Sequence, residues 1–375
     1  MNTNVNSVAI TDYMYSKASR AKIPLSGTFE LSPVCNFSCK MCYVRKTAKE
    51  VAAHSRPALT LEQWLQIAEE AKNQGMLYLL LTGGEPFLWT GFWGLYEKLC
   101  QMGFLISINT NGSLIDDKAI QRLREMPPKR VNITLYGASD ETYKALCGVE
   151  GVFRRVDHAI HGLKEAGIKV KLNASMTPYN VMDLEKIVAY AKEQELFLET
   201  ATYMFPPVRR DMKMVGQNER FSPKEAAFWR LQCQKLLKSK EQYESFLRNI
   251  INGYMMPPGL DESCIDPVDG KIRCRAGNAS FWITWDGWMT PCGMMPDPKV
   301  DITKGKFEQR WKELTQVSEQ VVLSGICGKC SNRKICHSCA AMAFAETGGS
   351  AGVPKYLCET VQFLKEYAEE ELKKI

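Results

Sequence analysis

Short apolar runs and longer amphipathic segments alternate along the first half of the chain. The amphipathic segments carry apolar residues at helical spacing, whereas the apolar runs have the length of buried strands. Because strands that are apolar on both faces and separated by helices form a parallel sheet covered by helices, the pattern predicts an α/β fold. The predicted strands cover residues 27–34, 76–82, 105–109, 131–136, 170–175 and 196–204, and the helices between them cover residues 60–73, 90–102, 116–126, 151–166 and 181–194.

Local signals place individual helices. Thr60 and Gln63 have the spacing of a capping box, and Gly75 stands where a glycine commonly ends a helix. Outside the alternating region, we predict a short helix over residues 13–22 and one long amphipathic helix over residues 223–248. This long helix would bridge the α/β region and the segment that follows it, with Cys233 as a small core residue.

Three cysteines follow the first predicted strand at a CxxxCxxC spacing: Cys35, Cys39 and Cys42. A loop this short can direct all three thiolates at one point. An iron–sulfur cluster held by three cysteines keeps one iron open to a ligand, whereas a four-cysteine cluster is closed. The alternative is a zinc site, although zinc sites more often use CxxC pairs. The loop follows a strand, so it lies at the carboxyl end of the sheet, where parallel α/β folds bind ligands.

The second predicted strand is followed at once by Gly83, Gly84, Glu85 and Pro86. The glycines let the backbone approach a ligand closely, and Glu85 can accept hydrogen bonds from an ammonium group. Later strands carry polar residues that would line the same site. These candidate ligand-binding residues are Asn109, Asn111, Thr134 and Asn173, and Asn173 shares one face of its strand with Lys171 and Ser175.

A second group of cysteines begins near residue 264. Eight cysteines are the ligand count of two closed four-iron clusters. Structural zinc is the alternative, and it would be colourless. His337, among these cysteines, is interpreted as an outer or surface residue. The eight candidate ligands are Cys264, Cys274, Cys292, Cys327, Cys330, Cys336, Cys339 and Cys358.

The cysteine spacing and the Gly-Gly-Glu-Pro turn together resemble the signatures of radical S-adenosylmethionine (radical SAM) enzymes. The resemblance implies a partial (β/α)6 barrel. It also implies that the open iron binds the amino and carboxylate groups of S-adenosylmethionine, which is cleaved to a 5'-deoxyadenosyl radical, while the turn holds the amino group. The aromatic residue usual before the third cysteine is replaced by Met41, with Tyr43 as another source of a ring. Where many relatives have an arginine for the carboxylate, this chain has Lys144 and Cys147.

The C-terminal spacing is similar to that of the SPASM domain, which carries two auxiliary [4Fe-4S] clusters. Interleaved ligation, as in that domain, implies that Cys274, Cys292 and Cys339 hold the proximal cluster with Cys264 as the fourth ligand. The distal cluster would be held by Cys327, Cys330, Cys336 and Cys358. The gap between Cys336 and Cys339 is two residues instead of the usual three.

The expected organisation has four parts. Residues 1–24 form a leader helix, residues 25–205 the radical SAM barrel, residues 206–262 a helical bridge and residues 263–375 the auxiliary-cluster domain. The cofactors expected from the resemblance are three [4Fe-4S] clusters and S-adenosylmethionine, with a flavodoxin- or ferredoxin-type electron donor.

The composition indicates which classes of partner the protein binds. The 48 Lys and Arg residues exceed the 42 Asp and Glu residues by six, but they are scattered and often paired with Glu, so we expect no nucleic acid. There is no apolar run long enough for a membrane span and no charged-then-apolar leader, which predicts a cytoplasmic protein. Fourteen cysteines in such a chain indicate metal binding more than disulfides.

The predicted function is that of a radical SAM oxidoreductase that removes a hydrogen atom from a carbon of its substrate, under anaerobic conditions. A ribosomally made peptide or protein is the first choice of substrate, modified by a crosslink or otherwise. Formylglycine formation, as in anaerobic sulfatase maturation, is an alternative, although Cys292 is followed by Gly293 and not by that maturase's aspartate. Dehydrogenation or epimerisation of a small molecule is another, and an iron–sulfur scaffold or sensor is the non-enzymatic one.

Overall fold

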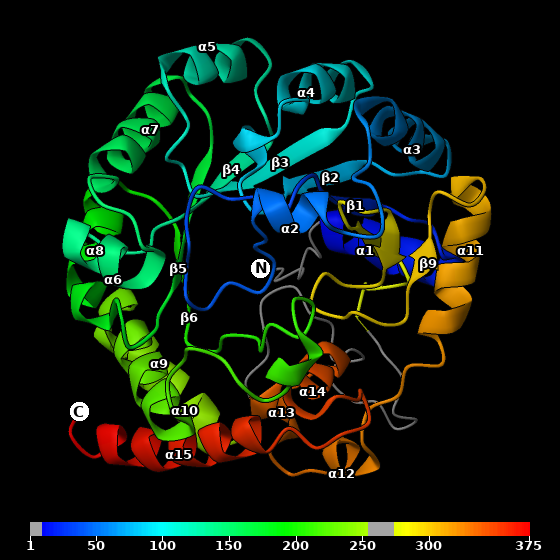
Figure 1. The fold of residues 1–375 in the computed structure, drawn as a ribbon. Helices are drawn as coiled ribbons and strands as arrows, with labels where there is room; N and C mark the ends of the chain where they lie inside the picture. Colours follow the sequence, from blue (N-terminus) through cyan, green and yellow to red (C-terminus); the bar gives the residue numbers. More distant parts are fainter. Residues whose placement is uncertain (1–9, 254–273) are drawn as a thin grey trace, which may run out of the picture.

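The computed structural model describes residues 10–253 and 274–375, and the six predicted strands form its main parallel sheet. Neighbours in the sheet are neighbours in sequence, and the helices lie outside the curved sheet (Figure 1). This arrangement confirms the α/β fold and the partial (β/α)6 barrel. The strands are β1 (Ser26–Glu30), β2 (Tyr78–Thr82), β3 (Leu105–Thr110), β4 (Arg130–Thr134), β5 (Val170–Ser175) and β6 (Leu198–Ala201).

The predicted helices of the barrel are also present. Thr60 and Gln63 form the predicted capping box, in which the Gln63 amide donates to Thr60 Oγ1 over 3.2 Å and the Thr60 amide donates to Gln63 Oε1 over 2.9 Å. The helices are α1 (Ile10–Ala21), α3 (Leu61–Asn73), α4 (Phe92–Gln101), α5 (Asp117–Glu125), α7 (Phe153–Glu165) and α8 (Leu184–Glu193).

Two helices of this region were not predicted. The first is the short helix α2 (Ala48–Ala52). The second is α6 (Asp140–Cys147), which begins after the N-cap Ser139 and ends at Gly148, whose φ of 67° is in the left-handed region. Ser139 and Gly148 are the signals that could have revealed α6, because serine is favoured at N-caps and glycine in left-handed C-caps.

The prediction of one long helix over residues 223–248 was wrong. The segment forms two helices, α9 (Pro223–Leu237) and α10 (Lys240–Ile251). Lys238 is extended, and Ser239 starts the second helix with a capping box to Gln242. The chain therefore turns at a residue that caps a new helix, a local signal that outweighs the apolar periodicity continuing through it. Cys233 is 1% exposed and belongs to the core, as predicted.

The C-terminal strands join the barrel sheet. Strand β7 (Ser280–Ile283) pairs in parallel with β1, and β8 (Trp288–Thr290) and β9 (Val300–Asp301) follow antiparallel. The strand order in the nine-stranded sheet is β6-β5-β4-β3-β2-β1-β7-β8-β9. We call residues 280–301 the meander, and it fixes the C-terminal part of the chain to the first strand of the barrel.

A second hydrophobic core lies between the bridge helices and the C-terminal helix α15 (Lys355–Leu372). Figure 1 shows α9, α10 and α15 side by side below the barrel. Between the meander and α15 lie α11 (Phe307–Ser318), α12 (Gly325–Gly328), α13 (Arg333–Cys336) and α14 (Ala340–Thr347). The buried residues of this second core are Ala227, Leu231, Tyr243, Leu247, Ile250, Ile335, Val361, Leu364 and Ala368.

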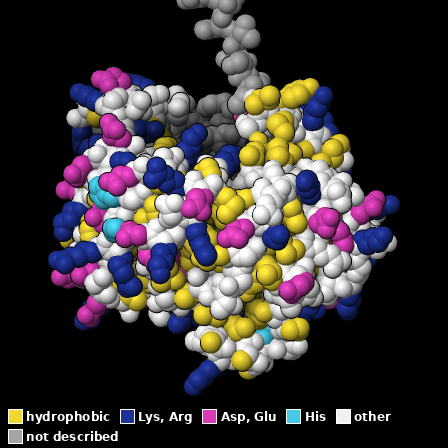
Figure 2. Space-filling view, turned by 90° about the horizontal axis from the view of Figure 1, so that it is seen from above, with side chains coloured by type: hydrophobic (Ala, Val, Ile, Leu, Met, Phe, Trp, Pro, Cys, Tyr) yellow, Lys and Arg dark blue, Asp and Glu magenta, His cyan; other side chains and the backbone are white. Residues whose placement is uncertain are grey.

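Charges are interspersed on the surface. On the face in Figure 2, basic and acidic side chains lie among one another, with hydrophobic side chains between them. The net positive charge is therefore not gathered into one patch on this face. In the part of the chain that the structure describes, no helix combines the length and the apolar character needed to cross a membrane.

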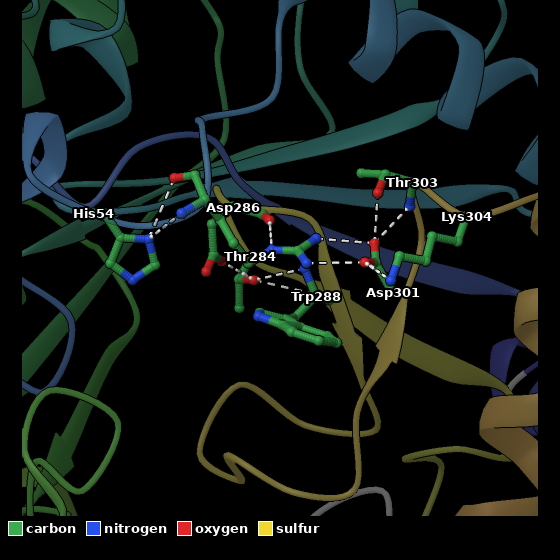
Figure 3. Close-up of polar contacts among 8 residues, drawn as sticks. His54, Thr284, Asp286, Trp288, Asp301, Thr303 and Lys304 are labelled. Atoms are coloured by element: carbon green, nitrogen blue, oxygen red, sulfur yellow. Dashed lines mark hydrogen bonds and ion pairs between the residues drawn. The ribbon is translucent and has the colours of Figure 1, made fainter.

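Arg56 ties the segment after the cysteines to the meander. Its guanidinium donates to both carboxylate oxygens of Asp301 over 2.9 Å, and its Nε donates to the Asp286 carbonyl over 2.9 Å. It also lies 4.3 Å from the centroid of the Trp288 ring. Figure 3 shows Asp286, Trp288 and Asp301 around this group. The hydrogen bonds to Arg56 hold the pKa of Asp301 well below its usual range.

Replacing Asp301 by Asn should lower the free energy of unfolding by roughly 2–3 kcal/mol, because a nearly buried charge-assisted pair is lost. Since the pKa of Asp301 is lowered in the folded chain, the pair stabilises above a pH of about 4 and its contribution is lost as the pH falls below that value. Denaturant unfolding at several pH values measures both effects. Lys304 also faces Asp301, at 3.8 Å, but is 77% exposed, so Lys304→Gln is the control and should change little. Equal losses in both variants would contradict the role of Arg56.

Candidate functional site

Residues 35–42, the cysteine loop, follow β1 and are held by the end of α6. The amide of Ser38 donates to the Cys147 carbonyl over 2.8 Å, and the amide of Lys40 donates to the Leu146 carbonyl over 3.0 Å. Phe37 is 1% exposed and packs against the rings of Tyr136 and Tyr143. A buried aromatic anchor and two backbone hydrogen bonds therefore fix the loop between its first and third cysteines.

The three thiols of the loop lie in one protected volume. Burial raises the pKa of Cys35 to about 12 and also raises the pKa of Cys42, and charge repulsion from Cys39 adds to both. Backbone amides point at two of the sulfurs, from Phe37 to Cys35 Sγ and from Arg45 to Cys42 Sγ, each over 3.4 Å. Amide hydrogen bonds to cysteine sulfur are a feature of iron–sulfur sites, where they set the reduction potential.

The donor set fits a cluster of several irons. Within residues 10–253 and 274–375, no three His, Cys, Asp or Glu side chains converge closely enough to hold a metal ion. The cysteines of the loop are instead close enough to influence one another's pKa while remaining apart. A four-iron cluster needs such a spread, because each thiolate binds a different iron. The thiols would lose their protons on binding, as metal ligands must.

The Gly-Gly turn presses on the backbone that leads into the cysteine loop. A Cβ atom on Gly83 would lie 2.3 Å from the Ser32 carbonyl oxygen, and one on Gly84 would lie 2.4 Å from the Val34 oxygen. Gly83 also has a φ of 150°. The turn is then bonded to the same segment, because the amide of Gly84 donates to the Ser32 carbonyl over 2.7 Å. The glycines are required here by contact with the chain itself.

Glu85, predicted to contact an ammonium group, is hydrogen-bonded within the protein. Its side chain is completely buried and accepts hydrogen bonds from Thr110 Oγ1 and the Asn111 amide, each over 2.8 Å, and from the Phe87 amide over 3.3 Å. Burial raises its pKa to about 7, although these hydrogen bonds oppose the shift. The carboxylate thus joins the turn after β2 to the end of β3, and its acceptors already have donors from the protein.

Asn111 connects this turn to the first cysteine. Its Nδ2 donates to Asn36 Oδ1 over 2.9 Å and lies 3.8 Å from Cys35 Sγ, and its Oδ1 accepts from the Ser113 hydroxyl over 2.6 Å. Glu85, Asn111 and Asn36 therefore form one chain of hydrogen bonds that ends at a cysteine sulfur. Three of the predicted site residues, Cys35, Glu85 and Asn111, are brought together here.

The other predicted ligand-binding residues lie on the inner face of the sheet. In β3, β4 and β5, polar residues alternate with buried apolar residues that face the helices. Asn109 accepts a hydrogen bond from Asn132 over 2.7 Å, and Thr134 is paired in register with Asn173. Lys171 is paired with Glu199, so its charge is already compensated. Asn109, Thr134 and Asn173 are half-buried and remain able to face a ligand inside the barrel.

The two candidates for the carboxylate contact lie in different surroundings. Lys144 is 69% exposed and pairs with Glu150 over 2.6 Å at the surface. Cys147 is fully buried, and its sulfur lies 3.4 Å from Cys39 Sγ. The structure therefore gives Cys147 a neighbour that the sequence could not show, since the two residues are 108 positions apart.

The C-terminal cysteines fall into two groups. Cys292 and Cys339 share one small apolar cluster with Met295 and Val321, and burial raises the pKa of both thiols. The pKa of Cys358 is raised by burial and by three nearby cysteines, which are Cys336, Cys327 and Cys330. Cys274 is exposed before β7, and Cys264 lies outside the described residues. Each group contains cysteines that interleaved ligation would assign to the same cluster, and the two groups correspond to two different clusters.

A buried ion pair, which the sequence did not predict, links the end of β1 to the segment around Cys292. Glu30, at the end of β1, is completely buried and accepts two hydrogen bonds of 2.9 Å from Arg209 and one of 2.9 Å from the Trp282 indole. Arg209 also donates to the Gly293 carbonyl, next to Cys292, over 2.8 Å. The only signal in the sequence was a charged residue at the end of an apolar strand, which is costly unless it is paired.

A cavity of about 360 Å³ lies between residues 43–56, which follow the cysteine loop, and the meander. Tyr43 and Lys46 line it from the segment after the loop, Trp285 and Trp288 from the meander, and Arg210 from the segment after β6. A second hollow of about 620 Å³ adjoins it, since Lys46 and Arg210 line both. His54 and Asp286 also line the first cavity.

With this geometry established, similarity to known proteins gives the family. Residues 29–191 match the Radical SAM superfamily. The chain is a radical SAM enzyme. Enzymes of this superfamily use S-adenosylmethionine and a [4Fe-4S] cluster, and the cysteine loop at the carboxyl end of β1 lies within the matched residues. This confirms the prediction of an S-adenosylmethionine-dependent iron–sulfur enzyme.

Two groups of curated relatives cover most of this radical SAM chain. An AdoMet-dependent heme synthase of Methanosarcina barkeri is 23% identical over 330 residues, covering 85% of this chain and 92% of that protein. A probable GTP 3',8-cyclase of Saccharolobus islandicus is 27% identical over 288 residues, covering 76% of this chain and 88% of that protein.

Solved structures share the fold over nearly the whole chain. The structure of anSMEcpe with bound AdoMet has a TM-score of 0.68 at 18% identity, covering 94% of this chain and 99% of that one. SuiB of Streptococcus suis bound to precursor peptide SuiA has a TM-score of 0.64 at 16% identity, covering 96% and 83%. The barrel and the C-terminal part of this radical SAM enzyme therefore follow an arrangement seen in both.

Replacing Glu85 by Gln should weaken S-adenosylmethionine binding by about 10- to 100-fold and lower stability by roughly 1–3 kcal/mol, because an amide group would face donors that need an acceptor. Equilibrium binding to the reconstituted protein and denaturant unfolding measure the two effects. Glu69→Gln, on the exposed side of α3, is the control. If both variants bind S-adenosylmethionine as the wild type does, the network from Glu85 to Asn111 does not shape the site.

Proposed function

We propose that this radical SAM enzyme oxidises a ribosomally made peptide or protein, with a crosslink as the first candidate product. The cluster and S-adenosylmethionine together supply a 5'-deoxyadenosyl radical that can take a hydrogen atom from an unactivated carbon. The cavity between residues 43–56 and the meander carries the proposal. Tyr43 follows Cys42 directly, and Thr290 and Met295 lie on either side of Cys292, so a segment bound there could reach both iron sites.

The shape of this region suits an extended ligand. The two adjoining hollows run on either side of Lys46 and Arg210, along the outer side of the cysteine loop. Aromatic side chains from the meander and basic side chains from the segment after the loop line the first hollow. The fold-level likeness to SuiB and anSMEcpe, both crystallised with peptides, supports the same class of substrate.

The residues of the chain have separate roles in this proposal. Cys35, Cys39 and Cys42 hold the S-adenosylmethionine-binding cluster, and the Gly83-Gly84 turn, Asn109, Thr134 and Asn173 surround S-adenosylmethionine. Glu85 positions the turn and Asn111. Cys327, Cys330, Cys336 and Cys358 hold one auxiliary cluster, and Cys264, Cys274, Cys292 and Cys339 hold the other. The two groups of neighbouring thiols described above support this division.

A second candidate is a small molecule that bears carboxylates. The heme synthase relatives favour it, because they match along most of their length. Basic residues at the cavity also favour it, since Lys46 and Arg210 form no ion pair among the described residues, whereas Lys299 lies 3.6 Å from Asp297. A guanidinium and an ammonium group would bind carboxylates.

The substrate test uses the reconstituted enzyme with S-adenosylmethionine and dithionite. One arm contains short peptides encoded beside the gene, and the other contains a tetrapyrrole carboxylate. We expect 5'-deoxyadenosine formation to rise with a peptide and the peptide to lose a pair of hydrogen atoms by mass spectrometry. A change in the tetrapyrrole alone would favour the second candidate.

Two cysteine variants should separate the open cluster from the auxiliary ones. Cys42→Ala should abolish cleavage of S-adenosylmethionine and lower the iron content from about twelve to about eight per chain, because the loop loses one of three ligands. Cys330→Ala should lose about four irons but keep cleavage without substrate. Iron analysis and chromatography of 5'-deoxyadenosine measure both.

Cys100 provides the control for both variants. It is half-buried in α4 and belongs to neither group, so Cys100→Ala should keep all the iron and full cleavage. Cleavage that persists in Cys42→Ala would overturn the assignment of the loop. Zinc in place of the iron lost by Cys330→Ala would overturn the auxiliary clusters and leave the loop assignment standing.

A further inference from the structure

Cys147 is the one thiol beside the cysteine loop that the proposed function leaves without a role. Its sulfur lies 3.4 Å from Cys39 Sγ, within the range of a hydrogen bond between sulfur atoms. Two ligands of a four-iron cluster bind different irons, so sulfurs this close are poorly placed to be ligands of the same cluster. Cys147 therefore has a different role from the three cysteines of the loop, which are placed as cluster ligands.

The contact is fixed by the backbone on both sides. Helix α6 ends at Cys147, where Gly148 turns the chain in the left-handed conformation. The carbonyls of Leu146 and Cys147 accept hydrogen bonds from the amides of Lys40 and Ser38, which flank Cys39. The two sulfur-bearing residues are thus held by hydrogen bonds between their own chain segments, and neither can move away without breaking them.

Cys147 belongs to the main hydrophobic core. The residue is fully buried, and the rings of Phe37, Tyr136 and Tyr143 pack together beside the loop. Cys39 Sγ lies within hydrogen-bond distance of the Cys147 thiol, and the Tyr136 side chain also hydrogen-bonds to Cys39. In a dry pocket a weak donor and an anionic acceptor interact more strongly than in water.

We propose that the Cys147 thiol donates a hydrogen bond to the Cys39 thiolate and thereby raises the reduction potential of the S-adenosylmethionine-binding cluster. This inference rests on the proposed role of Cys39 as a ligand. A ligand thiolate carries no proton, so the proton between the two sulfurs belongs to Cys147. A donor to a ligand sulfur stabilises the more negative, reduced cluster, and this is one of the levers by which proteins set cluster potentials. Cys147 is a positioning residue in this account, since it acts through Cys39.

The test is an anaerobic redox titration of the reconstituted enzyme, followed by the electron paramagnetic resonance signal of the reduced cluster. Cys147→Ala should keep the cluster and shift its midpoint potential to more negative values. Cys147→Ser keeps a donor and should restore the potential towards that of the wild type. Cys233→Ala removes an equally buried cysteine from α9 and should leave the potential unchanged.

A second measurement needs no cluster. In metal-free protein, a diazene thiol oxidant should join Cys39 to Cys147, with both thiol hydrogens passing to the diazene, and peptide mass spectrometry should find this disulfide. An unchanged potential in Cys147→Ala, loss of the cluster in both Cys147 variants, or absence of the disulfide would overturn the proposal. A wild-type loop that forms the disulfide but binds no cluster would instead overturn the ligand role of Cys39 and, with it, the proposed function.

Discussion

The position of the cysteine loop depends on one contact between two pieces of backbone. Residues 83–84 lie so close to residues 32–34 that a single Cβ atom on either glycine would overlap a carbonyl oxygen. The amides of Gly84 and Glu85 donate hydrogen bonds to the same segment. The end of β2 therefore positions the start of the loop. Glu85 extends this contact to β3 through Thr110 and Asn111, and Asn111 reaches Cys35. Three adjacent strands thus hold one sulfur in place.

The sequence predicted the parts of the fold that depend on local patterns. It did not predict the parts that depend on contacts between residues far apart in the chain. The six strands and five barrel helices follow from apolar periodicity and caps, and the structure confirms them. The long helix over residues 223–248 failed because the cap at Ser239 is stronger than the periodicity across it. The pairing of β7 with β1 was not predictable, because β7 is only four residues long and its partner lies some 250 positions away.

The same limit applies to the site. Motif residues such as Cys35 and Gly83 could be recognised by their spacing, but spacing did not show that Glu85 accepts hydrogen bonds from Thr110 and Asn111 on the next strand. Arg209 and Cys147 carried no motif at all. Each gains its importance from a partner far along the chain, Glu30 in one case and Cys39 in the other. Only the folded backbone brings such pairs together.

The shared sheet also holds the cysteine loop and the C-terminal segment in a fixed arrangement. Because β7 is bonded to β1, the meander has a fixed register relative to the strand that leads into the cysteine loop. Arg209 adds a second link, since it bonds to Glu30 at the end of β1 and to the carbonyl beside Cys292. The cavity is therefore bounded by segments that are both hydrogen-bonded to β1. Its walls come from three stretches of chain, near residues 43–56, 209–210 and 284–299, which share no motif. In the proposed function, the signature residues provide the radical chemistry and these walls select the substrate.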